Sequence, residues 1–247
     1  GLVCFAASIV AISVFHRAIA SQATMRRAWI GIAGAAFGFG IWGTHFIAML
    51  AYEPGVSTGY GVVLTGVSLA VAMILTTIGF GIAASGPARW RAPAGGGIAG
   101  GGIAGMHYLG MWALEVPGRI NWSPDLVIAS ILLGMIFGHV ALTVALRSSD
   151  RRTTLTAALF LTLAVVSHHF TAMGAVTLIP DPTLGSDTMS ISPTALSFLT
   201  AVAAFAILGL SLLAAMIDRR AKGELHSQKV LLDTALDNMS QGLCMFD

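Results

Sequence analysis

Three short stretches decide how this chain folds: residues 44–49 are Thr-His-Phe-Ile-Ala-Met, 106–111 are Met-His-Tyr-Leu-Gly-Met, and 168–173 are His-His-Phe-Thr-Ala-Met. Each contains a histidine, an aromatic residue directly after it and a methionine four residues after it. The three histidines, His45, His107 and His169, are spaced by 62 residues each time. A fixed interval of this length marks an internal triplication. We therefore predict three copies of one structural unit, each carrying a His/Met pair.

The composition indicates what kind of protein these copies build. Of the 247 residues, 56% are hydrophobic and 10% are charged, whereas about a quarter of the residues of a soluble domain are charged. Apolar stretches of roughly the length that crosses a bilayer as a helix recur at residues 2–15, 28–51, 60–84, 94–115, 125–146, 155–179 and 192–217. We therefore predict an all-α integral membrane protein whose seven transmembrane helices occupy residues 1–217 and contact the lipid bilayer.

Each 62-residue copy contains two of these stretches, so all copies enter the membrane in the same direction. Repeats of this kind are related by an axis along the membrane normal. We expect three helix pairs around a pseudo-threefold axis, formed by 28–51 with 60–84, 94–115 with 125–146, and 155–179 with 192–217. The stretch 2–15 is then an extra N-terminal helix.

The charged residues predict the orientation in the membrane. Twelve of the thirteen Lys and Arg residues fall at one end of the predicted bundle or after its last helix, and Arg119 alone falls at the other end. Acidic residues lie at the end that contains Arg119: Glu53, Glu115, Asp125, Asp181 and Asp187. Because loops rich in Lys and Arg stay in the cytoplasm, we place the N-terminus outside and the C-terminus in the cytoplasm.

Two glycine patterns in the apolar stretches have the spacing G-x-G-x-x-G, at Gly95, Gly97 and Gly100 and at Gly38, Gly40 and Gly43. A dinucleotide-binding loop with this spacing needs a strand before it and a soluble crevice around it. Inside membrane helices, glycines instead let neighbouring backbones approach closely. We therefore interpret both patterns as helix-packing surfaces.

A His/Met pair with four-residue spacing presents an imidazole and a thioether on one face of a helix. These donors favour a soft ion such as Cu(I), or Cu(II) where nitrogen or oxygen donors complete the shell. Magnesium and calcium prefer oxygen ligands, and zinc usually takes thiolate, imidazole or carboxylate ligands. We therefore predict a copper site whose ligands come from His45, Met49, His107, Met111, His169 and Met173.

Met106 and His168, which directly precede repeated histidines, are two further candidate ligands. Neighbouring positions on a helix diverge by about 100°, so these side chains either join one asymmetric site or face adjacent helices. The pattern leaves open whether the pairs form three sites or one.

Counted from residue 28, His45 lies about 25 Å along its helix and so just below the outer surface. His139 has no repeat partner and is interpreted as a packing residue.

The tail after the last apolar stretch differs in composition. Residues 218–241 predict a cytoplasmic linker helix, since Leu225, Leu232 and Met239 recur every seven residues as in a coiled coil, which is compatible with a homodimer. Residues 242–247 are typical of the first strand of a further domain. We expect the polypeptide to continue beyond this chain.

The histidine stretches resemble the thrice-repeated signature of the MHYT domain. The signature reads Met-His-Tyr-Thr, and no copy in this chain has all four residues. Only the histidine occurs in every copy, whereas the Met is matched only by Met106, the Tyr only by Tyr108 and the Thr only by Thr171. The resemblance covers about residues 1–217 and implies a sensory module of the bacterial inner membrane that binds copper near the outer face and senses oxygen, carbon monoxide or nitric oxide. The tail from residue 231 is similar to the entry into PAS domains that connect such modules to cyclic-di-GMP synthesising or degrading domains.

The residues and the resemblance together predict a sensory input module that relays ligand binding to a cytoplasmic output domain. Catalysis is not expected within this chain, nor is a nucleic-acid partner. Haem held by two of the histidines and a transporter of copper or small molecules are the alternatives. A retinal-type photoreceptor is excluded, because neither Lys222 nor Lys229 lies in a predicted span to form a Schiff base. An intramembrane metalloenzyme would need a carboxylate base beside the histidines.

Overall fold

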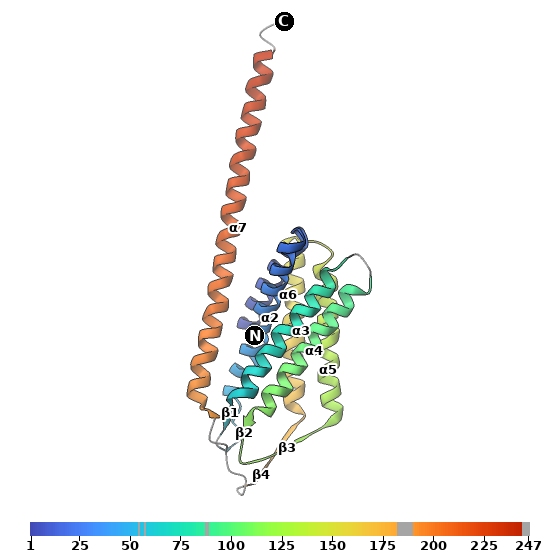
Figure 1. Cartoon of the computed structure of the whole chain (residues 1–247), viewed down its shortest axis with the longest axis vertical. Coiled ribbons are helices and arrows are strands. Elements are labelled where there is room, and N and C mark those ends of the chain that lie inside the picture. The colour runs from blue at the N-terminus through green and yellow to red at the C-terminus, as the bar shows by residue number, and fades with distance from the viewer. Residues whose placement is uncertain (54, 57, 87–88, 182–189, 244–247) are drawn as a thin grey trace. The chain divides into compact units, whose positions relative to one another are not determined.

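The computed structural model describes residues 1–53, 55–56, 58–86, 89–181 and 190–243, and these residues are almost entirely helical (Figure 1). The bundle contains α1 (Leu2–Ala20), α2 (Ala23–Leu50), α3 (Val62–Ala84), α4 (Arg91–Trp112), α5 (Pro124–Ala145) and α6 (Arg151–Gly174). A further helix, α7, covers Pro193–Leu243. The predicted all-α class is confirmed, with short strands as its only other regular elements among the described residues.

Five of the described helices, α1, α2, α3, α5 and α6, are long and apolar enough to cross a membrane. They support the prediction of a membrane protein. Helix α4 has a comparable length of 22 residues, but glycine takes the place of apolar side chains along much of it. The apolar part of α7 within the described residues, Pro193–Ala206, is shorter than a span. The count of seven spans therefore stays a prediction.

The bundle is a ring of helices whose three histidine-bearing members face the interior. Helix α3 packs between α2 and α4, and α5 packs between α4 and α6. Helix α1 packs against both α2 and α6, so it holds the position that a third outer helix would have. It is extra in the sequence but part of the ring in space. The described residues give no comparable packing of α7 on α6, and their pairing stays a prediction.

Glycines set the distances between neighbouring helices, and their contacts follow the 62-residue interval. A Cβ atom on Gly34 would lie 2.6 Å from Cα of Thr77, and one on Gly96 would lie 2.7 Å from Cα of His139. One interval separates Gly34 from Gly96, and the same interval separates their two partners. Contacts this short exclude any side chain. Of the six glycines in the two G-x-G-x-x-G patterns, Gly38, Gly40, Gly95 and Gly100 have such contacts, whereas Gly43 and Gly97 do not. All six lie inside helices, so the structure agrees with the packing role for four of them and not with a dinucleotide loop.

Two small sheets lie at the end of the bundle where α2, α4 and α6 terminate (Figure 1). Strand β1 (Gly59–Gly61) pairs antiparallel with β2 (Leu114–Glu115) and with β5 (Ser190–Ile191), and β3 (Gly118–Trp122) pairs antiparallel with β4 (Val176–Pro180). The predicted helical spans 94–115 and 155–179 are therefore wrong at their ends, where β2 and β4 follow. An apolar run does not by itself distinguish a helix from a buried strand.

Helix α7 passes through both the last predicted span and the predicted linker 218–241 without a break. By its internal contacts the chain divides into two units, residues 1–208 and 209–247. In the first unit, one face of α7 is buried at Leu196, Thr200 and Ala203. Residues 244–247, and with them Cys244 and most of the predicted strand 242–247, lie outside the described residues.

Polar groups fix the connection between α5 and α6 at the end of the bundle that carries the arginines. His16 of α1 donates from Nε2 to the carbonyl oxygen of Ala145 (2.8 Å), and its Nδ1 lies 3.3 Å from the hydroxyl of Thr154. Asp150 caps α6 by accepting the backbone N–H of Thr153 (2.8 Å), which lowers the pKa of Asp150 to about 2. His16 therefore has a structural role at the junction of α1, α5 and α6.

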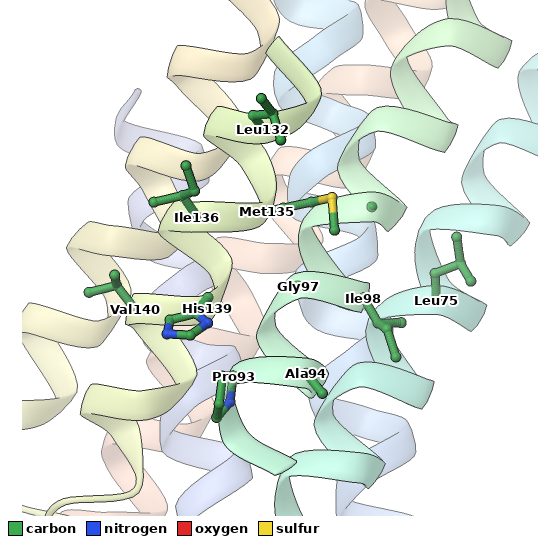
Figure 2. A pocket seen from close by; sticks show the side chains of 11 residues that line it. Leu75, Pro93, Ala94, Gly97, Ile98, Leu132, Met135, Ile136, His139 and Val140 are labelled. Carbon is green, nitrogen blue, oxygen red and sulfur yellow. The ribbon is translucent and has the colours of Figure 1, made fainter. Parts of the chain in front are cut away.

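The outer face of α4 lies at the bottom of a groove between α3 and α5 (Figure 2). Gly97 and Gly101 are on this face, and Leu75 of α3 and Met135 of α5 stand on either side. The groove is separate from the interior, where the histidine-bearing faces of α2, α4 and α6 meet.

We predict that replacing Gly100 with alanine destabilises the bundle by about 1–3 kcal/mol, because an added methyl group overpacks a close contact. Its Cβ would lie 2.6 Å from Cα of Met135. A Cβ atom added at the adjacent Gly101 would have no neighbouring atom within 4 Å, so Gly101→Ala should cost nothing and can gain up to about 1 kcal/mol from helix propensity. Thermal unfolding of the two variants in detergent measures the difference, and equal melting temperatures would contradict the packing role.

Candidate metal centre

The three repeated histidines lie at the same height in three helices. His45, His107 and His169 each lie five residues before the last residue of α2, α4 and α6, respectively. In the interior of the ring, α4 contacts both α2 and α6. The 62-residue interval therefore places three imidazoles at one depth, close to the end that the small sheets cover.

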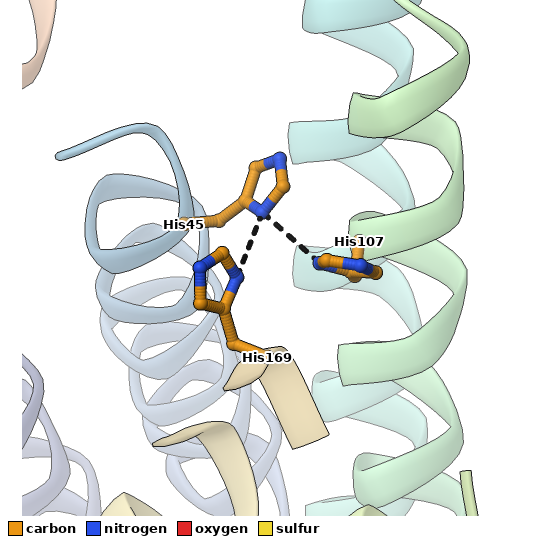
Figure 3. A group of neighbouring side chains, drawn as sticks. All are labelled: His45, His107 and His169. Atoms are coloured by element: carbon orange, nitrogen blue, oxygen red, sulfur yellow. Dashed lines mark hydrogen bonds between the residues drawn. The ribbon is translucent and has the colours of Figure 1, made fainter. Parts of the chain in front are cut away.

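The three side chains point toward one another (Figure 3). Nδ1 of His45 lies 3.1 Å from Nδ1 of His107 and 3.3 Å from Nδ1 of His169. One ring nitrogen from each histidine falls in a group whose members are all within 4.8 Å of one another. The exposed fractions of the three residues are 1%, 1% and 6%. The cluster is therefore compact and shielded from solvent and lipid.

Hydrogen bonds among the histidines cannot satisfy this arrangement. An imidazole nitrogen carries either one proton or one lone pair in the ring plane. Nδ1 of His45 has two nitrogen neighbours but can form a hydrogen bond with only one of them. A cation that accepts the lone pairs of all three nitrogens would satisfy them together. Two nitrogens at about 2.05 Å from one tetrahedral ion lie about 3.3 Å apart, which is close to the observed separations.

His168 lies beside the cluster with its tautomer fixed. Its Nδ1 donates to the carbonyl oxygen of Ser130 in α5 (2.9 Å), so its Nε2 carries the lone pair. That Nε2 is buried and has no hydrogen-bond partner among the described residues, and the ring centroid lies 5.1 Å from that of His107. A backbone carbonyl that orients one ring nitrogen is the usual companion of a metal-binding histidine. His168 thus faces both an adjacent helix and the cluster.

The candidate methionines share the helices of the histidines. Met49, Met106 and Met111 are buried, and Met173 is half-buried against the core. The structure brings His45, His107 and His169 into mutual contact, and it places His168 against His107. The four methionines are buried or half-buried near the same ends of α2, α4 and α6.

The electrostatics of this end of the bundle favour a cation. Three helices end just beyond the histidines, and a helix C-terminus carries partial negative charge. The cluster itself contains only histidines among the described residues that could supply a nitrogen, thiolate or carboxylate ligand. Glu53 is exposed and is a solvated charge, whereas Oε2 of Glu115 is buried without a partner in the described part of the chain.

Tyr60 in strand β1 packs against the end of α2 that carries His45. It is 2% exposed, its ring packs edge-on against Phe46, and its hydroxyl lies 3.5 Å from the carbonyl oxygen of Met49. Burial raises the pKa of Tyr60 to about 12; the hydroxyl of a tyrosine is uncharged at neutral pH even without such a shift. Sequence reasoning missed Tyr60, because the residue was read as the start of the apolar stretch 60–84. The repeat contained a signal, since Trp122 lies 62 residues later and its ring packs on Tyr108 at 5.3 Å, as the ring of Tyr60 packs on Phe46 at 5.6 Å.

Sequence reasoning also missed Gly110, which sets the position of His45. A Cβ atom at Gly110 would lie 2.6 Å from Nε2 of His45. The equivalent positions in the other copies are Ala48 and Ala172. A signal was present in the sequence, because this site in the repeat is always a small residue.

Comparison with known proteins agrees with this architecture. The family model MHYT, described as a bacterial signalling protein N-terminal repeat, matches residues 38–96 and 100–158. The two matches begin 62 residues apart, which is the interval between the histidines. The chain belongs to the MHYT family. The matched residues contain the first two copies of the MHYT repeat, with His45 and His107.

Curated relatives of this MHYT chain are signalling proteins. An uncharacterized signaling protein of Caulobacter vibrioides is 33% identical over 74% of the chain and 22% of its own length. In Pseudomonas aeruginosa, the bifunctional diguanylate cyclase/cyclic di-GMP phosphodiesterase MucR is 31% identical over 98% of the chain and 36% of its length, and the cyclic di-GMP phosphodiesterase NbdA is 31% identical over 78% and 26%. The chain therefore spans about a third or less of these relatives. No solved structure matches it.

We predict that Gly110→Ala weakens metal binding at the histidine cluster by at least about tenfold, or 1.4 kcal/mol, because the methyl group displaces the His45 ring. Gly43→Ala is the matched control, since Gly43 lies two residues from His45 and has open space at its Cβ position. Competition titration with Cu(I) chelators measures both affinities. Equal affinities for the two variants would show that His45 is not held in place by Gly110.

Proposed function

We propose that this MHYT chain is the membrane input module of a signalling protein and that it binds one copper ion between His45, His107 and His169. The observation that carries the proposal is the convergence of three buried Nδ1 atoms, two pairs of which are 3.1 and 3.3 Å apart. In a membrane protein, buried ionisable groups are costly and usually serve function. Three of them at one point have no structural purpose that apolar side chains could not fulfil.

Further donors surround this point in the proposed site. Nε2 of His168 has a free lone pair, and the thioethers of Met49, Met111 and Met173, with Met106, lie on the same helices. We propose that one donor of this set completes the shell of the ion while no gas is bound and gives up its position when a gas binds. Nitrogen together with thioether sulfur suits copper better than calcium or magnesium.

A bare ion suits the cluster better than haem does. Bis-histidine haem needs a slot that separates two imidazoles by the width of the macrocycle and its iron. Here three ring nitrogens approach from three helices to within 4.8 Å of one another, which supports a single ion. The same convergence supports one shared site for the three His/Met pairs.

We propose that the sensed ligand is a small diatomic gas, O2, CO or NO. When copper is bound, three histidines leave room in its coordination shell for such a ligand. A ligand shifts helix packing only if it binds one arrangement more tightly than the other. The bonds of Ser130 to His168 and to Tyr108, whose hydroxyl lies 2.7 Å from Oγ of Ser130, join α4, α5 and α6 beside the cluster. A displacement at the site therefore acts on three helices.

We also propose the finer topology: seven spans with α4 and the first part of α7 among them, in the bacterial inner membrane, N-terminus outside and C-terminus in the cytoplasm. The arginines support it, because they gather where α1, α3 and α5 end and where α2, α4 and α6 begin. Loops rich in arginine remain cytoplasmic. The histidines then lie near the outer face.

For the whole protein we propose an output in cyclic-di-GMP signalling, carried by domains outside this chain. The names of MucR and NbdA support this, and α7 supplies a helical route toward a PAS-like or other cytoplasmic domain. Leu232 and Leu236 of α7 are 60% and 55% exposed, which suits a helix that pairs with a second copy. We assign no catalysis to the chain itself.

We predict that the purified chain carries one copper ion and that replacing His45, His107 and His169 together with alanine removes it. His139→Gln is the control, because this histidine lies on the outer groove. Elemental analysis measures the copper, and an absorption spectrum without a Soret band distinguishes copper from haem. Wild-type copper content in the triple variant would refute the site.

We further predict that the reduced, copper-loaded chain takes up carbon monoxide in equal amount to its copper, because the histidines leave a coordination position open. Infrared spectroscopy under carbon monoxide measures the uptake. The triple histidine variant provides the background, and wild-type protein that takes up no more than this background would contradict a gas-sensing role.

A further inference from the structure

The groove over α4 has a volume of about 970 Å³ and is lined by apolar side chains of α3, α4 and α5, with His139 as its polar member (Figure 2). Its size is at the upper end of the range for small-molecule sites. The outer faces of membrane helices contact lipid, so an open groove at this place is filled by whatever the bilayer supplies. It is independent of the histidine cluster in the interior.

The groove exists in the second copy because of residues that the other copies lack. Gly97 and Gly101 correspond to Ala35 and Phe39 in the first copy and to Leu159 and Leu163 in the third. The larger equivalents are exposed, Phe39 by 37%, Leu159 by 49% and Leu163 by 37%. They therefore cover the face of the helix that the glycines leave open. His139 also departs from the repeat, since Thr77 and Ala201 take its place.

One end of the groove is basic. Pro93 and Ala94 line it at the start of α4, directly after Arg89, Trp90 and Arg91. Arg89 and Trp90 are exposed, and the guanidinium of Arg91 lies 5.7 Å from the centre of the Trp90 ring. Tryptophan at the membrane interface and arginine beside it are the side chains that contact lipid headgroups.

We propose that the groove binds one anionic phospholipid, with an acyl chain along Gly97 and Gly101 and the phosphate at Arg89 and Arg91. His139 offers a hydrogen bond to the ester region, since it lies six residues, about 9 Å, from the basic end of α5. A membrane helix could also pack on two glycines four residues apart. The apolar face of such a helix would offer no partner to Arg89 or to the His139 ring, whereas a phospholipid offers its phosphate to the arginines and its ester groups to His139. The guanidinium of Arg91 already donates to the carbonyl oxygen of Ser85, and its other N–H groups are left to donate to a phosphate.

Native mass spectrometry of the chain, released from membranes of mixed phosphatidylglycerol and phosphatidylcholine, tests the proposal. The wild-type chain should retain one phosphatidylglycerol. Two variants fill the groove with residues taken from the other copies: Gly97→Ala with Gly101→Phe, and Gly97→Leu with Gly101→Leu. Both should lose the retained lipid, while Gly66→Leu, on an exposed part of α3 outside the groove, should keep it. Thermal unfolding confirms that each variant is folded.

Arg89→Gln with Arg91→Gln should reduce the preference for phosphatidylglycerol by about fivefold for each arginine, the equivalent of about 1 kcal/mol per charge. Arg147→Gln with Arg152→Gln, exposed at the same end of the bundle, should leave the preference unchanged. Three results would overturn the proposal: lipid retention that survives filling of the groove, equal retention of both lipids by the wild-type chain, or filled variants that dissociate a dimer without losing lipid.

Discussion

The structure depends on one constraint: nitrogen atoms that can bind protons or metal are enclosed in an apolar helix bundle, where they need partners. Three imidazoles meet at Nδ1, and geometry allows His45 to hydrogen-bond only one of its two neighbours. Helix packing holds them there. Glycines at Gly34, Gly96 and Gly100 bring the backbones of α2 and α4 against those of α3 and α5, and Gly110 leaves just enough space for the His45 ring. Small side chains thus position the reactive ones.

The repeat explains the symmetry of the bundle, and departures from the repeat explain its individual sites. The 62-residue interval puts the three histidines at one height, five residues from three helix ends. The third outer position of the ring is filled by α1, which comes before the first copy, so the ring closes without α7. The first copy has Thr44 where the second has Met106 and the third has His168. This difference makes the surroundings of the three histidines asymmetric. Gly97, Gly101 and His139 make the second copy the one with an open groove.

Much of this architecture could be predicted from the sequence. Composition and apolar stretches indicated the membrane class and the approximate place of each helix, because a span has a fixed length, and the repeat predicted the equal depth of the histidines. The sequence predicted that the helices continue beyond Trp112 and Gly174, but strands β2 and β4 follow there. A short apolar run has the same pattern at a helix end and in a strand. Ser130 was not found, because its role depends on contacts with Tyr108 of α4 and His168 of α6, far away in the chain. Tyr60 was not found, because it was read as the first residue of an apolar stretch. The sequence did not decide between one shared metal site and three separate sites. That choice depends on whether the three histidine side chains converge, and a sequence does not give side-chain positions.

X-ray absorption at the copper edge of the metal-loaded chain tests the central claim most directly, because it reports the atoms bound to the ion. The account predicts one copper per chain with scattering from about three imidazole rings at about 2 Å. The absence of imidazole scattering, or three separate copper ions with one histidine each, would contradict it.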